Sequence, residues 1–131
     1  MSTFVKQADI AVDNLDWGDI GWRAHPANTG CKTFVVMDVS LEPGFGHDFH
    51  KHPDQDEMII VKAGQIEQWI GEERTMLGVG DSVYLDADVV HASFNVGSET
   101  AHLQVVLAPA VGDEGYQLVD VSAEQPWASL R

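Results

Sequence analysis

Short runs of alternating apolar and polar residues follow one another along most of this 131-residue chain. Alternation with a period of two predicts half-buried β-strands, because successive side chains of a strand point to opposite faces of a sheet. No long window carries an apolar stripe at the three- and four-residue spacing of a helix. The runs that predict strands are 17–23, 32–41, 57–62, 65–70, 74–77, 82–85, 91–96, 101–107 and 116–121.

Turn residues separate these runs at short intervals, for example at 63–64 and at 78–80. Many short strands with regularly spaced turns are typical of an antiparallel sandwich or barrel, so we expect an all-β fold. Neither a linker nor an internal repeat divides the chain. We expect one domain over 1–131, with a core barrel over about 30–121, an N-terminal strand or arm over 1–29, and a C-terminal tail over 122–131 that forms a short helix or a loose segment.

The charge of the chain limits its partners. Seven Lys and Arg residues stand against 21 Asp and Glu residues, which gives a formal net charge of −14. Nucleic acids and anionic membrane surfaces both require a concentrated basic face, and the sequence has none. We therefore expect neither partner, and we expect a small-molecule substrate instead.

Cys31 is the single cysteine, so no intrachain disulfide can form. This usage fits a reducing compartment. The N-terminal residues lack the charged start and apolar core of a signal peptide, and no stretch has the length of a membrane-spanning helix. We expect a soluble cytoplasmic protein.

Three of the six histidines lie within six residues, at His47, His50 and His52. Residues two apart in a strand share a face, so His50 and His52 can converge while His47 is expected on the opposite face. Glu57 follows a turn that can return it beside this pair, and His91 begins a later strand run. Three imidazoles and a carboxylate suit a divalent transition metal, although this local spacing also occurs in solvated polar loops.

Two longer motifs surround these residues. Residues 44–64 read G-x5-H-x-H-x4-E-x6-G, and residues 80–95 read G-x5-D-x-D-x2-H-x3-N. The first pattern resembles the first conserved motif of the cupin superfamily at every marked position. The second resembles the other cupin motif, except that Asp86 replaces the usual proline and Asp88 the usual inner glycine. These departures affect a turn and not a ligand, because aspartate is a common turn residue that tolerates a left-handed conformation.

The resemblance implies a single jelly-roll β-barrel in which His50, His52, Glu57 and His91 bind one divalent metal, namely Fe, Mn, Ni or Zn. It also implies a small organic substrate at this centre, with dioxygenase or isomerase and lyase chemistry both open and Glu57 as a possible catalytic base. The alternative is a binding module or sensor without catalysis. Small cupins usually pair, so we expect a homodimer, with 3–10 as a candidate strand at its interface.

Four further residues are candidates for the pocket or for support of the ligands. Ile59 shares a strand face with the glutamate, where it lines the pocket or fills the core, and Ser93 shares a face with the last histidine. His102 and Gln104 share one face of another strand, and either an inward position near the metal or an outward, solvated position is compatible with the pattern.

Overall fold

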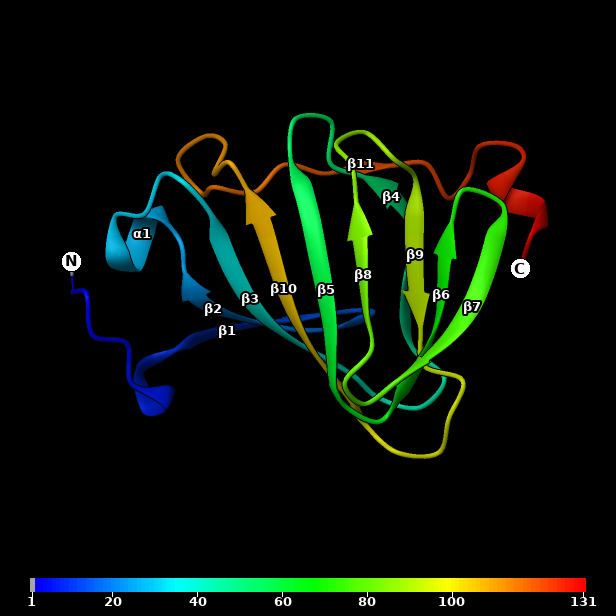
Figure 1. The fold of residues 1–131 in the computed structure, drawn as a ribbon, viewed down its shortest axis with the longest axis horizontal. Coiled ribbons are helices and arrows are strands. Elements are labelled where there is room, and N and C mark those ends of the chain that lie inside the picture. Colours follow the sequence, from blue (N-terminus) through cyan, green and yellow to red (C-terminus); the bar gives the residue numbers. More distant parts are fainter. Residues whose placement is uncertain (1) are drawn as a thin grey trace.

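The computed structural model describes residues 2–131 as two antiparallel β-sheets that face each other across a common core (Figure 1). One sheet has the strand order β1-β2-β3-β10-β5-β8, and the other has the order β11-β4-β9-β6-β7. The six strands of the first are β1 (Ala11–Leu15), β2 (Gly18–Ala24), β3 (Val35–Leu41), β10 (Ala101–Ala108), β5 (Asp56–Ala63) and β8 (Ser82–Leu85). The five of the second are β11 (Val119–Asp120), β4 (Gly46–Lys51), β9 (His91–Phe94), β6 (Gln65–Ile70) and β7 (Glu73–Gly78).

The main core lies between the two sheets. Every second residue of β3 is buried, and β5 and β10 follow the same period, so each strand turns its apolar face inward. Burying one such aliphatic side chain stabilises the fold by roughly 1.5–3 kcal/mol. The buried residues of this cluster include Val35, Met37, Val39, Leu41, Ile59, Val61, Leu103, Val105 and Leu107. This is the all-β jelly roll that the sequence predicts.

A second apolar cluster covers the outer face of the smaller sheet. Phe49, Trp69 and Phe94 pack there with two smaller residues, and the C-terminal segment lies against them through Trp127 and Leu130. That segment contains a short 3-10 turn, η2 (Trp127–Ser129), so the tail is packed and not loose. All four residues of β9 are buried as a result, because both faces of this strand are covered.

Most of the predicted strands are confirmed, and the differences have local causes. The sequence pattern does not predict β1 and β4, and the run 116–121 forms a strand only at Val119–Asp120. Earlier in that run, the backbone N–H and C=O of Gln117 bond to side chains instead of a neighbouring strand. The predicted strand at 3–10 is wrong, since this segment contains the 3-10 turn η1 (Gln7–Asp9). The other helical element is α1 (Pro26–Thr29).

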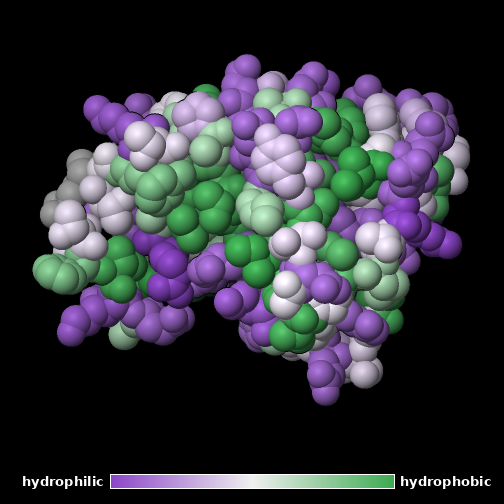
Figure 2. All heavy atoms as spheres, viewed as in Figure 1, coloured by the Kyte–Doolittle hydropathy of each residue, from purple (hydrophilic) through white to green (hydrophobic). Residues whose placement is uncertain are grey.

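Figure 2 shows hydrophobic residues beside hydrophilic ones on this face of the molecule. The structure holds a single chain, so the homodimer stays a prediction. Cys31 is half-buried near the surface. Across residues 2–131, every helix is too short or too polar to cross a membrane.

The turn before β9 has the conformation that the motif comparison predicts. Asp88 has a φ of 70°, and it is the one non-glycine residue with a positive φ in the described chain. Its backbone N–H donates to the carbonyl oxygen of His52 at 2.9 Å, and its carboxylate lies 3.3 Å from the Lys51 ammonium. An aspartate thus fills the position where the family usually has glycine.

Substitution of Asp88 tests this turn. Asp88→Val should lower the free energy of unfolding by about 1–2 kcal/mol, because a β-branched residue is strained in the left-handed region. Asp88→Asn is the matched control and should change it by less than about 0.5 kcal/mol, because asparagine tolerates this conformation and the exposed ion pair with Lys51 contributes little. Urea denaturation measures the free energy of unfolding of both variants. Equal values for the two would contradict the left-handed conformation of residue 88.

Candidate metal centre

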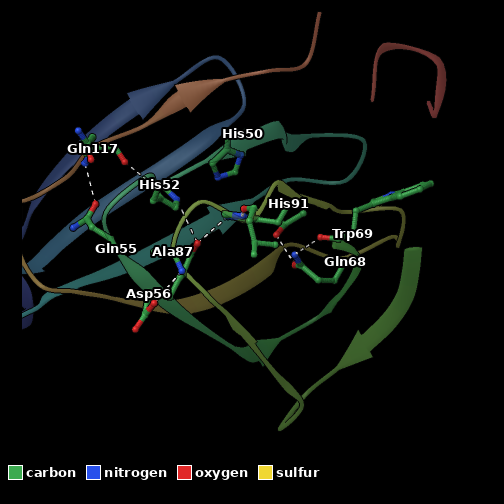
Figure 3. Close-up of polar contacts among 12 residues, drawn as sticks. His50, His52, Gln55, Asp56, Gln68, Trp69, Ala87, His91 and Gln117 are labelled. Carbon is green, nitrogen blue, oxygen red and sulfur yellow. Dashed lines mark hydrogen bonds and ion pairs between the residues drawn. The ribbon is translucent and has the colours of Figure 1, made fainter. Parts of the chain in front are cut away.

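Three buried histidines meet on the inner face of the smaller sheet. His50 lies near the end of β4 and His52 just beyond it, and His91 begins β9 directly opposite His50 in the strand register. One ring nitrogen from each histidine lies within 4.8 Å of the other two. Figure 3 shows the three side chains around one region of the barrel interior. The structure therefore brings together all three histidines that the motifs select.

A backbone carbonyl fixes each of the three imidazoles. The Nδ1 atoms of His50, His52 and His91 lie 2.6, 2.6 and 3.0 Å from the carbonyl oxygens of Asp48, Gln117 and Val89. A carbonyl only accepts hydrogen bonds, so each Nδ1 must carry a proton and donate it. In the neutral rings the Nε2 lone pairs are then free, which is the arrangement of metal-binding histidines.

Glu57 completes the group from the start of β5. Its Oε1 lies 2.8 Å from His91 Nε2 and 3.3 Å from His52 Nε2. Despite the short distance, Glu57 Oε1 and His91 Nε2 are buried without a hydrogen-bonding partner in suitable geometry. Two orphaned acceptor atoms that face each other repel unless a proton or a cation lies between them. The donor set of three imidazoles and one carboxylate fits a divalent transition metal at this point.

The ionisation of these groups agrees with such a site. Burial raises the pKa of Glu57, but the positive charges that His91 and His52 carry when protonated outweigh burial and hold this pKa below its ordinary value. Burial and the neighbouring imidazoles lower the pKa of His50, so its ring is neutral. Burial also lowers the pKa of His91, but the charge of Glu57 raises it more. A proton and a metal therefore compete for the space between His91 and Glu57.

His47 lies on the same side as this cluster, which corrects the prediction from strand alternation. A register shift in the pairing of β4 with β9 falls between His47 and His50, and such an irregularity breaks the period of two. The two rings stack with centroids 3.6 Å apart and planes 14° apart. An imidazole binds metal within its ring plane, so two rings stacked face to face are poorly placed to share one ion. His50 would therefore hold the metal with His52 and His91, and His47 would cover its ring.

The other predicted pocket residues divide into two groups. Ile59 and Ser93 both line the cavity beside the histidines, and Ile59 also belongs to the main core. The Ser93 hydroxyl donates to Gln68 Oε1 at 2.6 Å, which satisfies this buried polar pair. The inward alternative for His102 and Gln104 is wrong, because both side chains lie on the outer face of β10.

The outer positions of His102 and Gln104 follow from strand alternation. Their neighbours Leu103 and Val105 occupy the inner face of β10, so the polar residues take the outer face. There His102 Nδ1 lies 3.1 Å from the Ser40 hydroxyl, and Gln104 Nε2 donates to an Asp38 carboxylate oxygen at 3.3 Å.

Gln55 supports the site and is not evident from the sequence, because it lies in a turn without periodicity. Its buried amide donates to the carbonyl oxygens of Pro109 and Gly115, each at 2.8 Å. Its carbonyl oxygen accepts the N–H of Gln117 at 3.1 Å (Figure 3). The same Gln117 holds His52 through its own carbonyl. Gln55 therefore fixes the distant segment that orients one of the histidines.

The space beside the histidines is small and mostly apolar. Its volume is about 30 Å³, enough for one or two water molecules. Trp17 and Tyr116 line it together with the histidines, and the sequence pattern marks neither as a site residue. Its aliphatic walls come from Ile20, Met37, Val39, Leu41, Ile59, Leu103 and Val105.

Loss of the Gln55 amide should affect both stability and the site. Gln55→Ala leaves several backbone groups without partners, and we expect the free energy of unfolding to fall by roughly 2–3 kcal/mol. The affinity for a divalent metal should fall about tenfold, because His52 loses its fixed orientation. Gln65→Ala, at the exposed first residue of β6, is the control and should change neither property. Denaturation and metal titration measure the two effects, and an unchanged affinity would contradict the role of Gln55.

Comparisons with known proteins agree with this architecture. The cupin domain family matches residues 37–107, which is more than half of the chain. A related protein, the polyketide synthase CurC of Streptomyces cyaneus, is 24% identical over 119 residues that cover 91% of this chain and 77% of that protein.

Two solved structures share the fold at low identity. A predicted oxalate decarboxylase from Thermotoga maritima has a TM-score of 0.71 at 18% identity and covers 82% of this chain and 99% of its own. A substituted PAC13 from Streptomyces with uridine has a TM-score of 0.73 at 15% identity and covers 92% of each chain. The two facing sheets, the motif residues in one cavity and the family match lead to one conclusion: this chain belongs to the cupin superfamily.

Proposed function

We propose that this cupin is a metal-dependent enzyme that moves protons on a small organic substrate with carbonyl or hydroxyl oxygens. His50, His52, His91 and Glu57 would hold one divalent metal. The observation that carries the proposal is the pair of orphaned atoms, His91 Nε2 and Glu57 Oε1, 2.8 Å apart in a buried cavity. Histidines fixed by carbonyls on the opposite nitrogen support it further.

When bound, the metal would act as a Lewis acid that polarises an oxygen of the substrate. The protein supplies the proton-transfer groups. Glu57 is ionised, because its pKa lies below its ordinary value, and its carboxylate can accept a proton from a carbon next to that oxygen. Burial and the charge of Glu57 raise the pKa of Tyr116, so the phenol keeps its proton and can donate a hydrogen bond.

This pair of groups favours isomerase or lyase chemistry over dioxygenase chemistry. A carboxylate base and a phenol hydrogen-bond donor line one cavity, and most of its remaining walls are apolar. The name of one relative, a polyketide synthase, supports reactions of compounds rich in carbonyl groups.

Metal content tests the site itself. Protein purified without chelator, or reconstituted with Fe, Mn, Ni or Zn, should hold about one ion per chain by inductively coupled plasma mass spectrometry. The double variant His50→Ala/His91→Ala should hold less than about a tenth of that amount, because two of three imidazole ligands are gone. His102→Ala is the matched control on the outer face and should retain the ion. Full occupancy in the double variant, or no uptake by the native chain, would refute the metal centre.

Glu57→Gln tests the catalytic base. The metal-loaded protein is offered a panel of hydroxy ketones and sugars in D2O, and NMR measures deuterium incorporation next to the carbonyl. We expect the variant to exchange at least about 100-fold more slowly, because the amide cannot accept the proton. Ligand binding without exchange or turnover in any metal form would favour the alternative of a non-catalytic binding module.

A further inference from the structure

A wide groove adjoins the small cavity and opens at the surface. Its volume is about 640 Å³, within the usual range of small-molecule sites, whereas the cavity itself measures about 30 Å³. Trp17, Ile20, His47, His50 and Tyr116 line both spaces. An organic substrate can therefore occupy the groove as it stands, where it meets His50, but it reaches His52, His91 and Glu57 in the small cavity only if part of this shared wall moves.

Stacked aromatic rings form the part of the wall nearest to the ligands. Trp17 stacks on His47 with centroids 4.0 Å apart and planes 7° apart, and His47 stacks in the same way on the ligand His50. Trp17 lies in the tight turn between β1 and β2. All five residues of β1 are exposed and the strand lies at the edge of its sheet. The Trp17 indole is half-buried and packs against the main core, so the movement that opens the wall is a rotation of this side chain rather than a displacement of the hairpin.

The groove is unfavourable for anions. Asp16, Asp48 and Asp120 line it, and its one cationic side chain within residues 2–131 is Arg131. The Arg131 guanidinium is already paired, with Nε 3.0 Å from Glu67 Oε1. The lining of the inner cavity, within the same residues, includes neither lysine nor arginine. A carboxylate or phosphate on the path to the metal would meet three like charges and no free cation.

We propose that Trp17 and His47 form a gate between the groove and the metal cavity, which passes planar, uncharged organic molecules and rejects anions of the same size. The inference rests on the proposed function, since the gate leads to the bound metal. A flat molecule suits this passage because displacement of Trp17 exposes the face of the His47 ring. The entering molecule can stack on that face and so take the place of the Trp17 indole.

Cobalt-loaded protein and three imidazole probes test the gate without any turnover. Imidazole is small, 4-phenylimidazole is planar and neutral, and 4-(1H-imidazol-4-yl)benzoate is planar and anionic. Stopped-flow absorbance of the cobalt band reports the arrival of each probe at the metal. In the native chain, we expect the neutral planar probe to associate at least ten times faster than its anionic counterpart. Asp16→Lys should reduce that preference severalfold.

Removal of the gate should raise the association rate of the bulky probe much more than that of the small one. Trp17→Ala should raise the association rate of 4-phenylimidazole at least tenfold and that of imidazole less than twofold, whereas Trp17→Phe should restore the slow rate. If Trp17→Ala does not fold, His47→Ala provides the same comparison. Equal association rates of 4-phenylimidazole in the native and alanine proteins, or equal association rates of the two planar probes in the native chain, would overturn the gate alone. Failure of the native chain to bind cobalt would overturn the metal centre, and the gate with it.

Discussion

The whole site depends on the direction in which three imidazole rings point. Each ring donates from Nδ1 to a backbone carbonyl, and this leaves Nε2 for the interior. Two of these hydrogen bonds are local, because His50 and His91 each bond to the carbonyl two residues earlier. The third joins His52 to Gln117, which is 65 residues away in the chain. Two ligands are thus oriented by their own strands, and the third is oriented only when the C-terminal part of the barrel has folded.

The rest of the fold supports these hydrogen bonds from both sides of the smaller sheet. The inner face of β4 and β9 carries the histidines, while Phe49 and Phe94 on the outer face pack under the C-terminal segment. Burial on both faces limits the movement of the strands, so the ligand atoms keep their separation. The exposed edge strand β1 contrasts with this rigidity, and Trp17, in the turn that follows it, is the side chain that the proposed gate moves. The proposed site thus combines a fixed group of candidate ligands with a movable approach to it.

Much of the fold could be predicted from the sequence, since it is set by local alternation. The predicted strands at 32–41 and 101–107 bury every second residue over the β3 and β10 that form there. The positions of His50, His52 and His91 follow from motif spacing. Alternation fails at His47 because the β4–β9 pairing shifts its register nearby, and a single sequence carries no signal for such a shift. Strand alternation also leaves open which face of β10 carries His102, because either face can surround a polar residue until the partner strands are known.

The residues that the sequence does not reveal act through long-range interactions. Gln55 bonds to groups 54–62 residues away in the chain, and Tyr116 reaches the cavity from a loop with almost no strand pairing. No periodic pattern marks either residue. Trp17 gives a turn signal only through the glycine beside it, and its stacking on His47 depends on how the edge hairpin closes over the barrel.

The orientation of the imidazoles can be measured directly by long-range 1H–15N NMR correlation on labelled protein, before and after addition of zinc. This account predicts that His50, His52 and His91 keep their proton on Nδ1 and that zinc shifts the Nε2 resonance of all three. His47 and His102 should show no metal-bound nitrogen. Metal binding through Nδ1 in any of the three rings would contradict the account. So would a zinc titration that leaves the Nε2 resonances of these three histidines unchanged.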